Sequence, residues 1–411
     1  MVSRYTNKDN VYLKGFKIQI FPDDKQKQYI ERNFEIARYV YNWALEKENE
    51  QYQLYKEGKV DKKHKFLSAY SLHRLYTNFR KQNAFLESFP YEAARIIIND
   101  LVYAFESFWR FDNKYPKFKS RKRSKNSFPV RSDRVYFEDN MLRIEGLKRR
   151  TGKIFTNYHT HEKKNDNIKY YNTRIVKDLL GRYWFCFKKE VIKPVSYNYF
   201  DINQVSISEP IGIDLNARPT IVLSNGQIYD RPNTDKINKR IKKLNRHTAR
   251  DKKCLEEQQK ELERTNSVFE LLPSNNAKKR IHALRKAHNR KANIKENFVQ
   301  TATTKIVKSR PAAIVIEDLS VRKMESLHNV AATIRDSNIY RISALLQYKC
   351  SNYGIPLITA NKFYPSSQIC SCCGAMKKIG SNKLYRCDNC GMVENRHLNA
   401  AKNLVKLAYE Y

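Results

Sequence analysis

The chain has 411 residues, with 79 Lys and Arg against 42 Asp and Glu, so its formal net charge is +37 at pH 7. This excess of positive charge is far beyond what solubility requires, and it predicts a polyanionic partner. The basic residues are interleaved with 27 Tyr and 20 Phe, whose rings stack on bases, so the composition favours nucleic acid over a lipid surface. The length exceeds one ordinary core and predicts two or three domains.

The sequence gives no signal for membrane insertion or for export. Its apolar runs all fall short of the roughly 20 residues needed to cross a bilayer, and the first ten residues lack an apolar signal core. Five of the eight cysteines lie between positions 370 and 390, while Cys186, Cys254 and Cys350 stand alone. This clustering predicts reduced thiols and a metal site instead of disulfides, and we expect a cytoplasmic, nucleoid-associated protein.

The N-terminal part reads as one strand followed by helices and then by more strands. Residues 14–21 alternate like a strand, and apolar residues recur at helical spacing over 29–45 and 94–109. We therefore expect a helical subdomain over about 25–110, with its aromatic stripes in the core. Short alternating runs between about 128 and 195 predict a small antiparallel sheet or barrel that the first strand could join.

A basic run over residues 114–125 follows the helical part, and Pro116 and two aromatic residues interrupt it. Such a run cannot bury itself, so it predicts a loop that contacts phosphates. The alternative is an ordinary solvated loop. The candidate contact residues are Lys117, Lys119, Arg121, Lys122 and Arg123.

The C-terminal half begins after a linker at about 191–210 that has no clear periodicity. Its order of strand meander, helices, strand, helix, strand and helix is that of an RNase H-like α/β domain. The expected elements are three short strands over 211–230, two antiparallel helices over 235–309 with a break at 272–276, a strand at 312–316, a helix at 336–353, a strand at 355–359 and a helix at 396–409.

Two Cys-x-x-Cys motifs carry the strongest chemical signal. They contribute Cys370, Cys373, Cys387 and Cys390, and a glycine follows each motif. Four thiolates fill the tetrahedral coordination of zinc and leave no open position, which predicts a structural zinc ribbon. Cys372 could ligate in place of a neighbour, and a redox dithiol is a weaker alternative.

Asp214 and Glu317 each lie in or just past a short apolar strand, where a charge is costly unless it has a partner. Adjacent strands of an RNase H-like sheet would bring the two carboxylates together, where they could hold magnesium for phosphodiester hydrolysis. Either residue alone could be only a turn or cap residue.

Six stretches of the chain form a pattern together: ARYVYNWAL at 37–45, YPKFKS at 115–120, IGID at 211–214, IVIEDL at 314–319, PSSQICSCCG at 365–374 and NAAKN at 399–403. In these stretches the chain resembles TnpB, the OrfB protein of bacterial insertion sequences and a relative of the type V CRISPR effectors. The resemblance implies a wedge-type β-barrel and a helical recognition lobe, followed by a RuvC nuclease domain with an inserted zinc ribbon.

The resemblance also implies domain limits and partners. A guide RNA and a target double-stranded DNA with a short adjacent motif are the implied partners, and we expect a monomer. The limits are 1–22 and 128–205 for the barrel, 23–127 for the recognition lobe, 206–365 and 394–411 for the RuvC-like fold, and 366–393 for the zinc ribbon.

One position departs from the family pattern. The first two RuvC acids correspond to Asp214 and Glu317, but His397 in the stretch NRHLNAA stands where the third catalytic Asp belongs. A neutral imidazole is a poor ligand for magnesium, so this change predicts weak Mg binding and severe loss of cleavage. Glu394 entering the site, His397 ligating manganese, or His397 acting as a general base remain open alternatives.

The leading hypothesis is therefore an RNA-guided DNA-binding protein that has lost cleavage and acts as a guide-directed transcriptional repressor, as nuclease-dead relatives of TnpB do. The alternative is an active RNA-guided DNA endonuclease of an insertion sequence that uses Asp214, Glu317 and a non-standard third ligand. A plain transposase and an RNA-binding zinc protein without a DNA target are less favoured.

Overall fold

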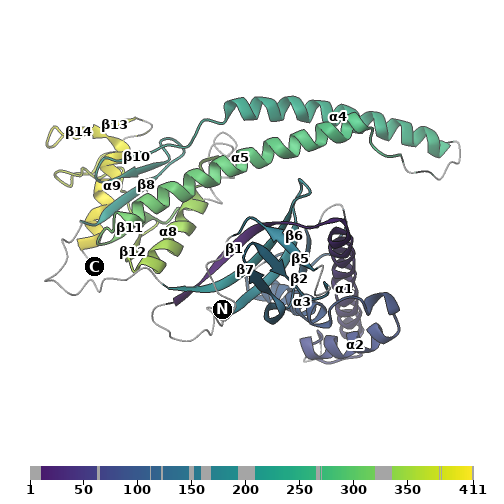
Figure 1. Ribbon diagram of the computed structural model, residues 1–411. Coiled ribbons are helices and arrows are strands. Elements are labelled where there is room, and N and C mark those ends of the chain that lie inside the picture. The colour runs from purple at the N-terminus through teal and green to yellow at the C-terminus, as the bar shows by residue number, and fades with distance from the viewer. Residues whose placement is uncertain are drawn as a thin grey trace. The chain divides into compact units, whose positions relative to one another are not determined.

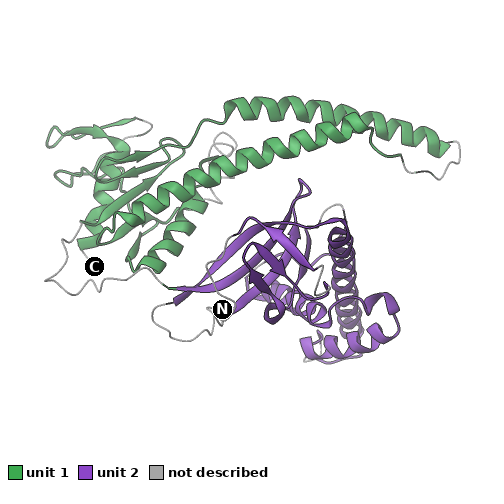
Figure 2. Cartoon of the chain, viewed as in Figure 1, with its two compact units in different colours: residues 1–10, 192–411 green, residues 11–191 purple. Residues whose placement is uncertain are grey.

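The structure is a computed structural model that describes residues 11–62, 65–111, 113–121, 124–147, 152–158, 168–192, 209–264, 269, 271–319, 336–378, 380 and 382–409. The chain divides into two compact units, residues 11–191 and residues 1–10 with 192–411 (Figure 2). We call them the N-terminal and the C-terminal unit. Among the described helices, none combines the length and the apolar character needed to span a membrane.

The N-terminal unit contains a seven-stranded sheet in which β1 lies between β7 and β5. The first strand thus joins the later strands, as the alternation of residues 14–21 predicted. In the described part of the chain β2 and β3 are the two ends of this sheet, so its closure into a barrel remains a prediction. The strands, in the order β2-β6-β7-β1-β5-β4-β3, are β1 Val11–Phe21, β2 Asn126–Pro129, β3 Tyr136–Glu138, β4 Met141–Arg143, β5 Lys153–Thr156, β6 Tyr170–Lys177 and β7 Tyr183–Ile192.

Three α-helices accompany this sheet: α1 Asp24–Lys56, α2 Ala69–Lys81 and α3 Tyr91–Phe111. Asp23 caps α1, because its side chain accepts from the backbone N–H of Gln26 while the Gln26 side chain accepts from the N–H of Asp23. Helices α1 and α3 confirm the two helical patterns. Helix α2 was missed because it buries only Leu72 and Tyr76, too few to show a period.

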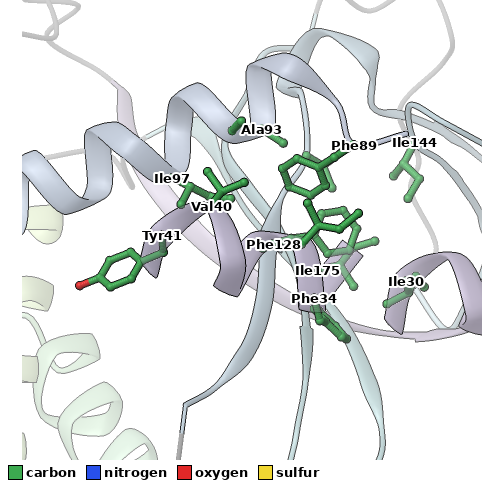
Figure 3. Packing of buried hydrophobic residues seen from close by; sticks show 14 of the residues in the cluster. Ile30, Phe34, Val40, Tyr41, Phe89, Ala93, Ile97, Phe128, Ile144 and Ile175 are labelled. Carbon is green, nitrogen blue, oxygen red and sulfur yellow. The ribbon is translucent and has the colours of Figure 1, made fainter. Parts of the chain in front are cut away.

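The core of the N-terminal unit lies between α1, α3 and the sheet (Figure 3). Phe34 of α1 packs edge-on against Phe128 of β2, with ring centroids 5.6 Å apart. The expected core role of the aromatic stripes is confirmed for Phe34 and Phe105, which are buried. Trp109 at the end of α3 remains half exposed, so that part of the stripe reaches the surface.

The C-terminal unit contains a five-stranded mixed sheet in the order β10-β9-β8-β11-β12. Strands β8, β11 and β12 run parallel, and the meander β8-β9-β10 is antiparallel, as the sequence predicted. All five residues of β8 are buried, which is typical of a strand covered on both faces. The strands are β8 Ile211–Leu215, β9 Ile221–Leu223, β10 Ile228–Tyr229, β11 Ile314–Glu317 and β12 Leu357–Ala360.

Within the described residues of this unit, the α-helices are α4 Asp235–Arg264, α5 Asn275–Lys308, α8 Ile339–Tyr353 and α9 Arg396–Lys406. Helices α4 and α5 lie side by side as the expected antiparallel pair, joined by two hydrogen bonds from Arg280 to Asp251 (Figure 1). Helix α4 ends earlier than the sequence indicated. Helix α5 begins where Ser274 accepts a hydrogen bond from the N–H of Ala277.

The cysteine-rich segment forms a small antiparallel hairpin of β13 Leu384–Arg386 and β14 Val393–Asn395, with a separate bridge between Ile369 and Met376. The glycines after the two motifs, Gly374 and Gly391, have φ of +78° and +71°. Only glycine adopts such angles without strain, so these two residues close the turns that carry the cysteines.

Candidate functional site

Strand register brings Asp214 and Glu317 to the same edge of the C-terminal sheet. Gly212 is paired with Val315 and Ile213 with Ile316, so the same offset places Asp214 beside Glu317. Parallel strands end at the same edge of a sheet, which is where α/β proteins hold their ligands. The two acids that the sequence proposed are therefore neighbours.

Both carboxylates lie in a poorly solvated environment. Asp214 is only 5% exposed, and it accepts a hydrogen bond of 2.6 Å from Nδ2 of Asn216. Burial, followed by repulsion from Asp214, raises the pKa of Glu317, and a hydrogen bond from the hydroxyl of Ser366 opposes this rise. A cation or a proton between the two carboxylates would relieve this repulsion.

His397 reaches this acid pair from the first turn of α9. The helix begins at Asn395, whose side chain accepts a hydrogen bond of 2.9 Å from the backbone N–H of His397. Nδ1 of His397 then lies 2.9 Å from Oδ2 of Asp214. The residue that replaces the expected third acid thus points into the site.

A glycine allows α9 to approach β8 closely enough for this contact. A Cβ atom on Gly212 would lie 2.0 Å from the carbonyl oxygen of Ala401 and 2.8 Å from the backbone nitrogen of Val405. Both atoms belong to the backbone of α9, so they cannot move aside as the end of a flexible side chain could. Gly212 is therefore required for the position of His397 relative to Asp214.

Glu394, the proposed substitute for the missing acid, is engaged elsewhere. Its carboxylate pairs with the ammonium group of Lys402 and lies 3.4 Å from the hydroxyl of Ser371. It belongs to β14, one residue before the cap of α9. Of the two residues considered for the third position of the site, His397 and not Glu394 therefore lies beside Asp214.

The acid pair is not gathered as tightly as a preformed metal site. Within the described ranges, the one set of at least three possible ligand atoms that lie within 4.8 Å of one another is that of the four cysteines. Asp214, Glu317 and His397 do not form such a set. The carboxylate oxygens suit magnesium, and the imidazole suits manganese better. The donor atoms are therefore of the right kind for a divalent cation, although they lie farther apart than the ligands of one ion.

The four cysteines fit zinc in both chemistry and spacing. The sulfur atoms of Cys370 and Cys390 are 3.6 Å apart, and those of Cys373 and Cys387 are 3.5 Å apart. Sulfurs at the corners of a tetrahedron around zinc, each about 2.3 Å from the ion, would be about 3.8 Å apart. The cluster contains Cys370, Cys373, Cys387 and Cys390 and not Cys372, which favours these four residues as the ligands.

Local hydrogen bonds prepare one of these thiols for metal binding. The backbone N–H of Ala375 and the side-chain amide of Asn389 lower the pKa of Cys373 to about 6. The thiolate is the form that binds zinc, so these hydrogen bonds favour the form of Cys373 that can act as a ligand.

Two asparagines of α9 connect the first cysteine turn to the acid pair. Oδ1 of Asn399 accepts from the N–H of Ser371, and its Nδ2 donates to the carbonyl of Ile369, so the two residues around Cys370 are fixed. Asn403, one turn later, donates to the carbonyls of Ser366 and Ile369. The hydroxyl of Ser366 in turn binds Glu317.

The sequence analysis did not identify Ser366, Asn399 or Asn403 as functional candidates. Asn399 and Asn403 are fully buried and spaced by four on a short helix that otherwise buries alanine and leucine. Two asparagines four residues apart on an otherwise apolar helix face could have indicated this role, since buried polar groups need hydrogen-bond partners.

The predicted phosphate-contacting loop is described as far as Arg121, and Lys122 and Arg123 lie outside the described residues. Lys117 and Arg121 are exposed, as expected. Lys119 differs, because its ammonium group lies 3.5 Å from the ring centroid of Tyr41. Burial lowers the pKa of Lys119 to about 8, so this lysine is a weaker candidate for a phosphate contact than its neighbours.

The fold and the four-cysteine cluster define a class before any relative is considered. The chain is an α+β multidomain protein with a four-cysteine cluster near its C-terminus. Residues 340–404 match the family model of the Cas12f1-like TNB domain, and residues 12–57 match that of the helix-turn-helix domain of OrfB from IS605.

Relatives agree with these matches over nearly the whole chain. A Streptomyces pristinaespiralis protein named "Putative RNA-guided DNA endonuclease" is 26% identical over 402 residues, which cover 95% of this chain and 88% of that protein. InsQ of Escherichia coli strain K12, of the same description, is 24% identical and covers 96% of this chain and 92% of its own length. The chain is thus related to the TnpB and IS605 OrfB proteins.

The fold is also that of a solved structure. The protein in the cryo-EM structure of a Cas12f1-sgRNA-target DNA complex superposes with a TM-score of 0.53 at 13% identity, covering 96% of this chain and 99% of that one. The overall fold is therefore Cas12f-like.

Proposed function

We propose that this chain is an RNA-guided DNA endonuclease of the TnpB type, with Asp214, Glu317 and His397 as its catalytic residues. The observation that carries the proposal is the meeting of two buried carboxylates at one sheet edge, with His397 Nδ1 2.9 Å from Asp214 Oδ2. The relatives named as RNA-guided DNA endonucleases support the RNA-guided activity. The net charge of +37 supports a nucleic-acid partner.

The sheet order of the C-terminal unit supports the RNase H-like, RuvC-type part of the proposal. Its parallel core β8-β11-β12 flanked by the meander places both acids on the central strands. The N-terminal unit, with its sheet and helices, would then be the wedge and the recognition lobe that bind the guide RNA and the short motif beside the target.

Each residue of the site has a distinct role in this proposal. Asp214 and Glu317 would hold the divalent cation, which when bound stabilises the negative charge that develops during phosphodiester hydrolysis. Ser366 orients Glu317, and Asn216 orients Asp214. His397 keeps Asp214 in place and can accept a proton at a ring nitrogen.

A second candidate function is guide-directed repression without cleavage. The observation that favours it is again His397, which brings an imidazole where a third carboxylate would add negative charge beside the cations. Removing one part of a preorganised electrostatic site costs on the order of 10²- to 10³-fold in rate. Target occupancy alone can block transcription and needs none of these three residues.

Single-turnover cleavage separates the two functions. The protein with its co-purified RNA is mixed with matching duplex DNA and Mg²⁺ or, separately, Mn²⁺, and compared with His397→Asp and Asp214→Asn. The endonuclease proposal expects the unaltered protein to cut, most rapidly with Mn²⁺, and Asp214→Asn to abolish cutting.

The repressor function expects the opposite pattern. In that case only His397→Asp cuts, while the unaltered protein binds the matching duplex without cleaving it. If neither protein prefers matching over mismatched DNA in a binding assay, both RNA-guided functions are wrong.

A further inference from the structure

The basic loop over residues 113–121 is held rigidly on helices α1 and α3 of the N-terminal unit. At its start the ring of Tyr115 packs edge-on against Phe105 and Phe108, with centroids 5.4 and 5.5 Å away. The hydroxyl of Tyr115 donates to Oδ1 of Asn49, at 2.8 Å. The next residue, Pro116, is buried. The loop therefore leaves α3 in one fixed direction.

A second anchor lies three residues later. The backbone of Lys119 makes two hydrogen bonds with the side chain of Asn42, which accepts from its N–H at 2.7 Å and donates to its carbonyl at 2.9 Å. The side chain of Lys119 covers the ring of Tyr41 at 3.5 Å. Beyond it, Ser120 and Ser124 close the turn through hydrogen bonds of 3.0 Å in both directions.

Between the two anchors only Lys117 and Phe118 face outward. The ring of Phe118 is 58% exposed, and within the described part of the chain it has no aromatic or cationic partner. Arg121, on the other side of the second anchor, is 82% exposed, and its guanidinium group lies 4.0 Å from the carboxylate of Glu35, which is itself exposed. A large apolar side chain is thus presented to solvent between two cations on a loop that cannot fold back over it.

We propose that Phe118 is a stacking platform for an unpaired base of a bound single strand, with Lys117 and Arg121 meeting the phosphates on either side of that base. An aromatic face and flanking cations are the chemistry that binds single-stranded nucleic acid without regard to sequence. The two anchors lower the entropic cost of binding, because the loop is ordered in advance. The inference rests on the proposed RNA-guided function, which would supply the bound strand. Its test measures binding of a single strand directly and does not require that function.

Salt dependence distinguishes stacking from phosphate contact. Each phosphate contact to a single strand contributes about 0.7 to the slope of log affinity against log salt concentration, whereas stacking contributes nothing to that slope. Lys117→Gln should therefore flatten the slope by about 0.7. Phe118→Ala should weaken binding about ten- to a hundredfold at every salt concentration with an unchanged slope, and Phe118→Trp should restore the affinity.

The experiment uses the full chain and a fluorescent single-stranded RNA of about 12 nucleotides that carries one 5-iodouridine. Irradiation followed by mass spectrometry is expected to place the cross-link on Phe118. The affinity series over salt is measured on the same probe. Phe269→Leu is the matched control, since Phe269 is 80% exposed in the C-terminal unit but has no flanking lysine or arginine in the sequence.

Three results would overturn the inference. The first is a cross-link on other residues that Phe118→Ala leaves unchanged. The second is a Phe118→Ala effect that disappears with rising salt, which would indicate a phosphate contact. The third is an equal loss of affinity for a duplex of the same length, which would indicate insertion between paired bases. None of these results depends on whether the protein cuts DNA.

Discussion

The zinc ribbon and the acid pair are two candidate metal sites in one unit, and they differ in completeness. In the ribbon four sulfurs already lie within 4.8 Å of one another, on two short turns closed by glycines. At the acid pair the ligands come from β8, β11 and α9, and one is an imidazole. A site assembled from local turns keeps its geometry by itself, whereas one assembled from distant strands depends on everything that packs between them.

Removing the ribbon metal should have the largest effect. Cys387→Ser with Cys390→Ser is expected to abolish zinc binding and to unfold the ribbon, since zinc contributes about 10–16 kcal/mol in isolated finger peptides. Metal content by mass spectrometry and thermal unfolding measure this. Cys372→Ser is the control and should leave both unchanged, because Cys372 lies outside the cluster. Zinc retained by the double variant would refute the assignment of the ligands.

A methyl group on Gly212 tests the packing beneath the acid pair. Gly212→Ala places a Cβ 2.0 Å from the carbonyl of Ala401, so the variant should lose at least about 3 kcal/mol of unfolding free energy, the upper end of the overpacking range. Denaturant titration measures the loss. Gly15→Ala is the matched control, since nothing lies within 4 Å of its Cβ position. Equal stability of the two variants would show that α9 does not rest on β8.

The two asparagines test whether the ribbon and the acid pair depend on each other. Asn403→Ala leaves the buried carbonyl of Ser366 without this donor and should cost about 2–3 kcal/mol. Because Asn399 and Asn403 both hold the segment around Cys370, zinc release to a chelator should accelerate about tenfold in either alanine variant. Ser366→Ala keeps these backbone contacts and should release zinc at the original rate. Unchanged release in all three variants would show that the regions are independent.

A carboxylate of the N-terminal unit, Glu48, is buried like that of Glu317, and burial raises the pKa of both. Burial raises the pKa of Glu48 to about 7 from its ordinary value of 4.5, opposed by the hydrogen bond from the N–H of Leu67. The folded chain therefore holds a proton between pH 4.5 and 7 that the unfolded chain has released, and stability falls as pH rises through this window.

Glu48→Gln should remove this dependence. The variant is expected to gain about 3 kcal/mol relative to the unaltered protein at pH 8 and to match it at pH 4, because the amide carries no charge at either pH. Denaturant titrations at the two pH values measure the difference. A gain of equal size at both would mean that the effect comes from packing and not from titration.

Much of the fold was predicted where a pattern is local. Helices α1 and α3 follow from apolar spacing, and the ribbon follows from two Cys-x-x-Cys motifs. Helix α2 and strands β2 and β6 were missed because each has too short or too mixed a pattern to show a period. The sequence analysis proposed Lys119 as a phosphate contact because of its charge alone. In the structure its ammonium group lies over the ring of Tyr41, which is 78 positions earlier in the chain, and no local pattern reveals such a contact.

Local patterns in the sequence predict the four-cysteine cluster, the short strands that carry Asp214 and Glu317, and the place of His397 at the start of the last helix. Each of these depends on spacing or on residue type within a few positions, where backbone geometry leaves little choice. Only the tertiary structure decided that His397 contacts Asp214, 183 residues away, that Glu394 is bound to Lys402, and that Phe118 faces solvent while Lys119 does not. The contact of His397 depends on strand register and on the close approach of α9 at Gly212, and the position of Lys119 depends on its packing against α1. Both arise between distant segments and not from the preferences of any one of them.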